Sequence, residues 1–297
     1  DIINNDVKDI MIKQTIQSAQ NQQEGTGVQQ DQDMTSIVSD IIVNSNTETG
    51  SKMIEELNNS STDTENDLSL KVISAISEKD TTKLNTLSEN NKEQIDTLTQ
   101  SAVKNAGSSQ ESADLIAKVV ANASDDFVNQ IISEVTKNST DENQALSAKV
   151  MKSIVETNPD KIENLNDENK DNLISQTIEA AKNQAEGTSS DELDLSNTIA
   201  EIVTNSDTGT AAKVLESLEE ASNDSDSKLS LSVVSNLTKQ ENYEEKMEIL
   251  SVTSSVVDQS INTLIEKAVE NASSEEDLEL VTDLVENSKG TLGDKIV

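Results

Sequence analysis

An internal repeat is the feature that most constrains how this chain can fold. Residues 40–78 align without a gap on residues 201–239, which lie 161 positions later, and 15 of the 39 aligned positions are identical. Most of the other apolar positions exchange one aliphatic residue for another. Repetition on this scale is typical of arrays in which each unit buries its apolar face against its neighbours. The sequence therefore predicts a repeat architecture.

The apolar residues of the repeat follow the period of a helix. Ile261, Leu264, Ile265, Ala268 and Val269 occupy one face of a helix, and similar stripes recur along the chain. Sustained strand-like alternation is hard to find, so we expect no sheet. Trp is absent and only one Phe and one Tyr occur, so Leu, Ile, Val and Ala must fill the core. The sequence predicts an all-α fold, an α-solenoid or superhelical stack of short antiparallel helix hairpins, with an elongated helical bundle as the alternative.

Helix ends are marked by Asn followed by a small residue. The pairs begin at positions 44, 59, 105, 122, 138, 205, 271 and 287. We expect these Asn residues to end helices in the left-handed conformation, and Gly25 and Gly187 to follow the ends of two equivalent helices. Pro159 is expected to start a short helix that reaches Leu165. Residues 243–272 are expected to form one long helix, or two helices that meet near Ser254.

Four copies of a larger unit can be traced along the chain. The signatures that end their first helices are residues 18–21, 102–105, 180–183 and 268–271. We expect one continuous array over residues 1–297, with units at 8–90, 91–167, 168–255 and 256–297. The last unit stops within its third helix. We therefore expect the chain to be an excerpt of a longer protein or a processed chain.

The charge of the chain excludes several classes of partner. Its net charge is −35, from 57 acidic residues against 22 basic ones, and every basic residue is Lys. Nucleic-acid binding needs a basic footprint, and anionic membrane surfaces repel a chain of this charge. No apolar run reaches the length of a membrane span. We expect no nucleic-acid partner and no membrane insertion.

Two acidic loops resemble the opening of a calcium-binding loop. They contain Asp63 and Asp67 in one copy and Asp224 and Asp226 in the other. A calcium loop needs Gly at its sixth position and a bidentate Glu at its twelfth, and neither loop has them. We therefore expect helix capping and weak, non-specific divalent-cation binding at these residues, with no specific metal site.

The chain is poor in catalytic residues. It has no His, Cys or Arg, so the usual bases, nucleophiles and anion-binding groups are missing. The composition still allows a carboxylate pair or a Ser–Lys pair, but nothing in the sequence places one in a pocket, and solvated helix faces account for the carboxylates. We expect no enzymatic activity and no cofactor. The absence of Cys leaves the compartment open.

One stretch carries a resemblance to a known group of proteins. Residues 175–207, SQTIEAAKNQAEGTSSDELDLSNTIAEIVTNSD, resemble the helical repeat regions of very large acidic bacterial surface proteins, some of which carry a FecR-type domain elsewhere. The resemblance is one of composition and covers most of the chain. It implies structural or adhesive work at the cell surface or outside the cell.

Two functions are consistent with these features. In the first, the chain is a structural scaffold or spacer segment of a large secreted or cell-surface repeat protein, with protein partners or self-association, because strong acidity keeps a long array soluble. In the second, it is an intracellular adaptor, cytoplasmic in location, that binds a basic protein or peptide on a concave face. The scarcity of aromatic residues argues against a hot-spot interface, and we therefore prefer the first.

Overall fold

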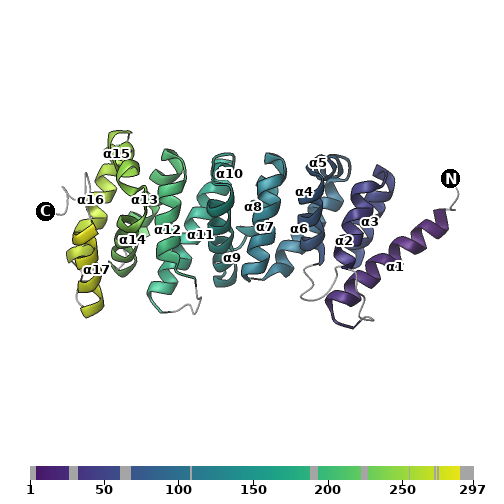
Figure 1. The fold of residues 1–297 in the computed structure, drawn as a ribbon, viewed down its shortest axis with the longest axis horizontal. Helices are drawn as coiled ribbons and strands as arrows, with labels where there is room; N and C mark the ends of the chain where they lie inside the picture. Colours follow the sequence, from purple (N-terminus) through teal and green to yellow (C-terminus); the bar gives the residue numbers. More distant parts are fainter. Residues whose placement is uncertain are drawn as a thin grey trace. The chain divides into compact units, whose positions relative to one another are not determined.

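The chain folds into helices throughout the part that the structure describes. The computed structural model describes residues 5–26, 33–60, 68–107, 109–187, 193–221, 227–253, 255–270, 272 and 274–287, and no strand occurs among them (Figure 1). The helices are α1 Asn5–Gln23, α2 Met34–Asn44, α3 Thr47–Ser60, α4 Leu68–Lys79, α5 Thr81–Asn90, α6 Lys92–Ala106, α7 Gln110–Asn122, α8 Asp125–Val135, α9 Asp141–Thr157, α10 Asp160–Glu163, α11 Asp167–Ala185, α12 Leu195–Asn205, α13 Thr208–Ala221, α14 Ser227–Lys239, α15 Tyr243–Thr253, α16 Ser255–Glu270 and α17 Glu275–Asn287. The predicted all-α fold is confirmed.

The first compact unit spans residues 1–138 and contains two layers of helices. One layer is formed by α1, α3, α6 and α8, and each of these helices contacts the next one in the layer. The other layer is formed in the same way by α2, α4 and α7, while α5 packs between α4 and α6. Contacts that skip one helix along the chain are the packing pattern of an α-solenoid.

The second compact unit spans residues 139–297 and repeats this pattern. Its layers are α11, α13 and α16 on one side and α9, α12, α14 and α17 on the other, and α15 packs against α13, α14 and α16. Both the sequence repeat and this packing make α11 to α17 the counterparts of α1 to α7. Each unit is an α-solenoid in its own right, as the sequence predicted.

Corresponding helices are joined by the same ion pair in the two units. In the first, the Lys52 ammonium on α3 lies 2.8 Å from the Asp9 carboxylate on α1. In the second, Lys213 on α13 lies 2.5 Å from Asp171 on α11. The hydrogen bond to the carboxylate raises the pKa of each lysine, although burial partly opposes it. The repeat therefore extends from the apolar pattern to individual polar contacts.

Several helices end at the expected Asn, but the Asn ends the helix in a different way from the one predicted. Asn44, Asn122 and Asn287 are the last helical residues of α2, α7 and α17, and each side-chain amide donates to the carbonyl four residues earlier at 2.8–2.9 Å. The residues that follow α2 and α7, Ser45 and Ala123, have extended backbones with φ of −84° and −81°. The expected left-handed Asn is therefore wrong at these ends. The amide instead satisfies one of the carbonyls that a helix end leaves without a partner.

Other helix boundaries also differ in detail from those predicted from the sequence. Pro159 directly precedes α10, which ends at Glu163, two residues before the expected Leu165. The stretch 243–272 contains two helices, α15 and α16, on either side of Ser254. At Asn138 the expectation is wrong, because α8 already ends at Val135. There the cap residue Thr136 donates its hydroxyl to the carbonyl of Ile132.

Two glycines should respond in opposite ways to substitution by alanine. Gly50 lies within α3, its counterpart in the second unit is Ala211, and a Cβ there would meet the Leu87 side chain at an ordinary 3.4 Å. Gly50→Ala should therefore raise the free energy of unfolding by about 0.5–1 kcal/mol. Gly25 has φ of +66°, and Gly25→Ala should lower it by roughly 1 kcal/mol through backbone strain. Urea unfolding measures both changes in the free energy of unfolding. Changes of the same sign would contradict the backbone conformations described for Gly50 and Gly25.

Candidate interaction surface

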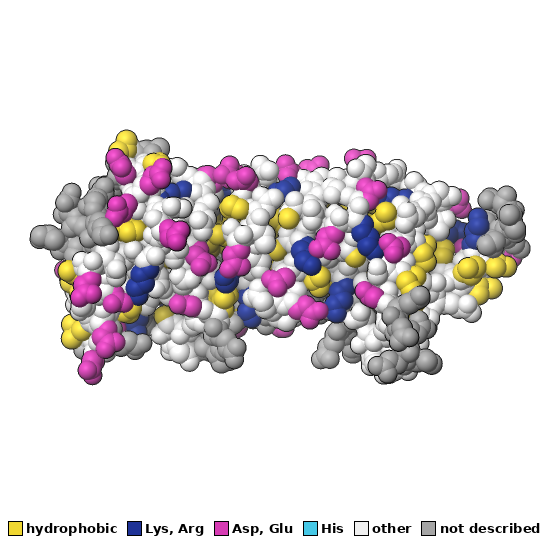
Figure 2. All heavy atoms as spheres, viewed as in Figure 1, with side chains coloured by type: hydrophobic (Ala, Val, Ile, Leu, Met, Phe, Trp, Pro, Cys, Tyr) yellow, Lys and Arg dark blue, Asp and Glu magenta, His cyan; other side chains and the backbone are white. Residues whose placement is uncertain are grey.

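The outward side of α2, α4 and α7 carries a series of ion pairs between helices. In the first unit the pairs are Lys79–Asp40, Lys118–Glu78 and Lys71–Glu111. The second unit has a pair at an equivalent place, and in all four pairs the nitrogen and oxygen atoms lie 2.8–3.4 Å apart. These side chains are all partly exposed, so each pair contributes only about 0–1 kcal/mol. On the face drawn in Figure 2, several lysines have acidic side chains beside them. The scarce lysines are thus used to join neighbouring helices.

One of these pairs is retained in the second unit with its charges reversed. Glu78 on α4 and Lys118 on α7 correspond to Lys239 on α14 and Asp283 on α17, which lie 2.8 Å apart. Exchange of the two signs preserves the attraction while changing the local surface charge. A surface that recognised one charged ligand in every unit would not tolerate this exchange. We interpret the pair as a contact that holds helices together.

A cavity of about 340 Å³ opens on the same side of the first unit. Its lining residues come from the end of α1 and from α2, α4 and α7, and they are Gln23, Asp33, Thr35, Lys71, Ser74, Ala75, Glu78, Leu115 and Lys118. Both charge signs line it, and Lys71 also donates to the Gln23 side chain at 3.2 Å. We call it the α2–α4–α7 groove. Its mixed lining suits a polar segment of a partner protein.

The second unit differs at the position that corresponds to this groove. Ala75 on α4 is replaced by Asn236 on α14, and the Asn236 amide donates to the Ser196 hydroxyl on α12 at 3.0 Å. The small Ala75 side chain leaves room that Asn236 takes up in the other copy. The lining of the groove therefore differs between the two copies, at Ala75/Asn236 as well as at the reversed pair Glu78/Lys239.

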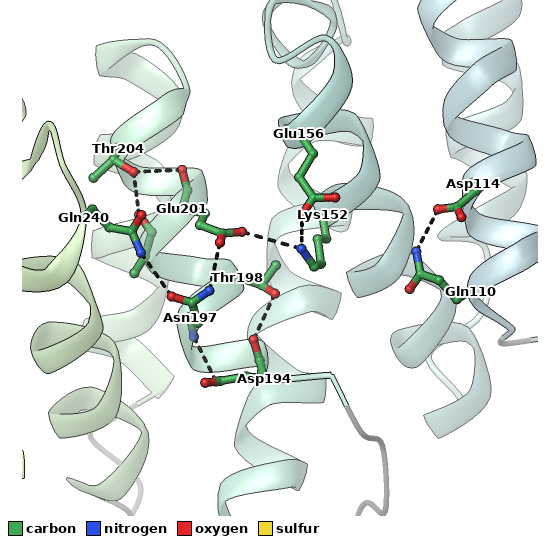
Figure 3. A network of polar contacts seen from close by, with 11 residues as sticks. Gln110, Asp114, Lys152, Glu156, Asp194, Asn197, Thr198, Glu201, Thr204 and Gln240 are labelled. Atoms are coloured by element: carbon green, nitrogen blue, oxygen red, sulfur yellow. Dashed lines mark hydrogen bonds and ion pairs between the residues drawn. The ribbon is translucent and has the colours of Figure 1, made fainter.

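The second unit carries a polar network across three helices (Figure 3). The Asn197 amide on α12 donates to Glu201 on the same helix at 2.8 Å, and Gln240, which follows α14, donates to Asn197 at 3.0 Å. Lys152 on α9 lies 3.8 Å from Glu201 and also pairs with Glu156. The network ties α9, α12 and the end of α14 together with side chains that already have partners.

A lysine with a shifted pKa has a structural role here. Burial lowers the pKa of Lys246 on α15, while Asp207 and Glu163 oppose the shift. Its ammonium donates to the carbonyl of Ser206, at the end of α12. Lys83 in the first unit donates in the same way to the carbonyl of Ser45, at 2.7 Å. Because the same contact recurs in both units, we assign Lys246 to helix capping rather than to catalysis.

Ser74 and Ser235 occupy equivalent buried positions, and neither hydroxyl has a hydrogen-bond partner among the described atoms. Ser74→Ala should therefore leave the free energy of unfolding unchanged or raise it by up to about 1 kcal/mol. Ser147 is equally buried but donates to Gln176 at 2.7 Å, so Ser147→Ala should lower it by about 1–2 kcal/mol. Thermal unfolding of the two variants measures the difference. A larger loss for Ser74→Ala would mean that its hydroxyl binds something.

The acidic residues singled out from the sequence lie outside the described residues. Asp63 and Asp67 fall between α3 and α4, and Asp224 and Asp226 fall between α13 and α14. Within the described ranges, no group of three or more acidic side chains is arranged to hold a metal ion. The sequence did not reveal the ion pairs between helices, although Asp9/Asp171 and Lys52/Lys213 are identical in the two copies and could have indicated them.

Comparisons with known proteins give no family. No family model and no curated protein matches the chain. Among solved structures, the RNA-binding domain of yeast Puf5p bound to SMX2 RNA shares 13% identity over 96% of this chain and 90% of that one, with a TM-score of 0.28. A chain from a computational design of self-assembling cyclic homooligomers shares 14% identity over 99% and 97%, with a TM-score of 0.17. Scores this low support no argument, so the fold rests on this chain's own helices and contacts.

Proposed function

We propose that the chain is a non-enzymatic structural scaffold or spacer segment of a large secreted or cell-surface repeat protein. The observation that carries the proposal is the recurrence of the same helix-to-helix contacts in both units, down to the pairs Lys52–Asp9 and Lys213–Asp171. Contacts of this kind hold successive helices together in an array. An adhesive role would use the protein surface of this array.

The charge distribution supports the same function. A net charge of −35 keeps neighbouring molecules apart and favours solubility at high concentration. The described lysines that form ion pairs do so mainly between helices, and the excess of acidic residues repels an acidic ligand. No helix of the described residues has both the length and the apolar character needed to cross a bilayer. These properties suit a segment that separates other domains.

The alternative is an intracellular adaptor that binds a basic protein or peptide. The observation in its favour is the α2–α4–α7 groove, which lies on a strongly acidic chain and has Asp33 and Glu78 in its lining. A basic segment would be attracted to it over the Debye length, about 10 Å at 0.1 M salt. The groove also contains Lys71 and Lys118, which weaken this attraction.

Titration with an oligolysine peptide distinguishes the two functions. For a spacer we expect weak binding without a fixed stoichiometry, and we expect it to vanish at roughly 1 M salt, where the Debye length is about 3 Å. For an adaptor we expect saturable binding to one site at about 0.1 M salt, and Glu78→Gln should weaken this binding more than Glu93→Gln on the exposed side of α6. Saturable binding that depends on Glu78 would contradict the spacer proposal.

The compartment needs a separate measurement. An antibody raised against the chain should label intact producing cells, or detect the protein in their medium, if the protein is secreted or surface-bound. Labelling that appears only after lysis would contradict this part of the proposal. An unrelated cytoplasmic protein of the same cells provides the control for leakage.

A further inference from the structure

One side of α1 exposes apolar side chains that no described helix covers. Val7, Ile10 and Met11 are 46%, 54% and 52% exposed, which is unusual for neighbouring aliphatic residues. Val7 and Met11 share their helix side with Gln14 and Ser18, at a spacing of 4, 3 and 4 residues. We call these four residues the α1 docking face.

The same face is buried in the second unit. The residues of α11 that correspond to the α1 docking face are Asn169, Leu173, Gln176 and Ala180, and all four are buried. The helix that packs on α11 most extensively is α9, which precedes it in the array. Polar contacts across this interface include a hydrogen bond from Ser147 to Gln176, at 2.7 Å, and one from Asn183 to Gln144, at 3.0 Å.

The helix that covers this face carries a recognisable pattern. In α9 it is Leu146-Ser147-x-x-Val150, in α4 it is Leu68-Ser69-x-x-Val72, and in α14 it is Leu229-Ser230-x-x-Val233. All of these named side chains are buried. Each of the three helices contacts the first helix of the next repeat, because α4 packs on α6, α9 on α11 and α14 on α16. A helix with the Leu-Ser-x-x-Val pattern is thus the regular cover of a first helix.

Equivalent positions in the other first helices support this assignment. Met11 corresponds to Ile95 in α6, Leu173 in α11 and Ile261 in α16, and these three side chains are buried. Beside Met11, an apolar cavity of about 220 Å³ is lined by Ile12, Ile41 and Met53 together with Lys8, Thr15 and Thr49. The α1 docking face therefore has both the apolar residues and the recess that an incoming aliphatic side chain needs.

We propose that the α1 docking face binds a helix of the Leu-Ser-x-x-Val type, supplied by a further repeat unit of the same kind. A second copy of residues 1–297 offers no such helix, because α4, α9 and α14 are each already packed on a first helix. Gln14 would accept the hydrogen bond that Gln176 accepts from Ser147. The inference depends on the repeat packing and is independent of the compartment and of the spacer role.

An extended chain tests the proposal. In this chain an additional copy of residues 125–166, which carry α8 to α10, is fused directly before residue 5. Asn166 of the added copy then directly precedes α1, just as Asn166 precedes α11 in the original chain. The chain has no Cys, so Met11→Cys places a single thiol in the face. We expect a thiol reagent to label this Cys at least roughly tenfold more slowly in the extended chain than in the original one. Val252→Cys, at an 83% exposed position, should be labelled equally fast in both chains.

A matched extension shows whether the apolar pattern is responsible. Leu146→Asp with Val150→Asp in the added segment should restore fast labelling of Met11→Cys, while circular dichroism shows that the original helices persist. Equal labelling rates in the original and the extended chain would overturn the proposal. Protection in the original chain that rises with protein concentration would also overturn it, because the occupant would then be a second copy.

Discussion

Phe127→Ala should lower the free energy of unfolding by about 3–5 kcal/mol, one of the two largest effects that we expect from a single substitution. Phe127 is the one phenylalanine of the chain and is almost fully buried on α8. This helix packs against α6 and α7. Small aliphatic side chains fill the rest of the core, and they cannot close the space that the ring would leave. Urea unfolding followed by circular dichroism measures the loss.

Val252→Ala provides the control for this experiment. Val252 lies near the end of α15 and is 83% exposed, so its truncation should change the free energy of unfolding by less than about 0.5 kcal/mol. A loss below 1.5 kcal/mol for Phe127→Ala would mean that the first unit is loosely packed around α8. The described packing would then be wrong in this region.

Val203→Asp should be at least as damaging and should destabilise by more than about 4 kcal/mol. Val203 on α12 is buried, and so is Val120, which occupies the same repeat position on α7. An unpaired carboxylate at either position loses its hydration without compensation. We expect loss of helical signal at 37 °C in both variants.

The repeat supplies the control for this prediction. Val285 on α17 occupies the same position of the repeat, but it is 54% exposed. Val285→Asp should therefore change stability by less than about 0.5 kcal/mol. The three substitutions are chemically identical and differ only in burial. Similar losses at all three positions would show that the exposure described at α17 is wrong.

The helices could be read from the sequence because their signals are local. Apolar residues at helical spacing form the buried side of nearly every helix, and Asn44, Asn122 and Asn287 end their helices where the Asn–small pairs placed the ends. The left-handed conformation expected for these Asn residues was wrong. An Asn that is the last helical residue and an Asn in the left-handed conformation give the same sequence pattern. The amide contact to the carbonyl four residues earlier appears only once the backbone is known.

Contacts between helices could not be read in this way. Lys52 and Asp9 are 43 positions apart, and nothing near either residue identifies the other. The α2–α4–α7 groove is lined by residues of α1, α2, α4 and α7, and this grouping appears only once these helices lie side by side. Tertiary packing decides which of many exposed Lys and Asp residues meet. The repeat carries this information indirectly, because paired positions are retained in both copies.

The number and register of the four repeat units remain predictions from the sequence. They assign equivalent places to Met11, Ile95, Leu173 and Ile261, one in each first helix. In the structure the last three side chains are buried and Met11 is half-exposed. A test of this register also tests the solenoid packing, because a shift by one residue would turn each of these positions toward another side of its helix.

The most direct measurement is therefore the thiol labelling rate at these four positions. Each is replaced by Cys in a separate variant, which is feasible because the chain has no other Cys. We expect slow labelling at positions 95, 173 and 261, limited by local opening of the packed helices, and fast labelling at position 11. Fast labelling at any of the three buried positions, in a variant that retains its helical signal, would contradict the repeat register and the solenoid packing built on it.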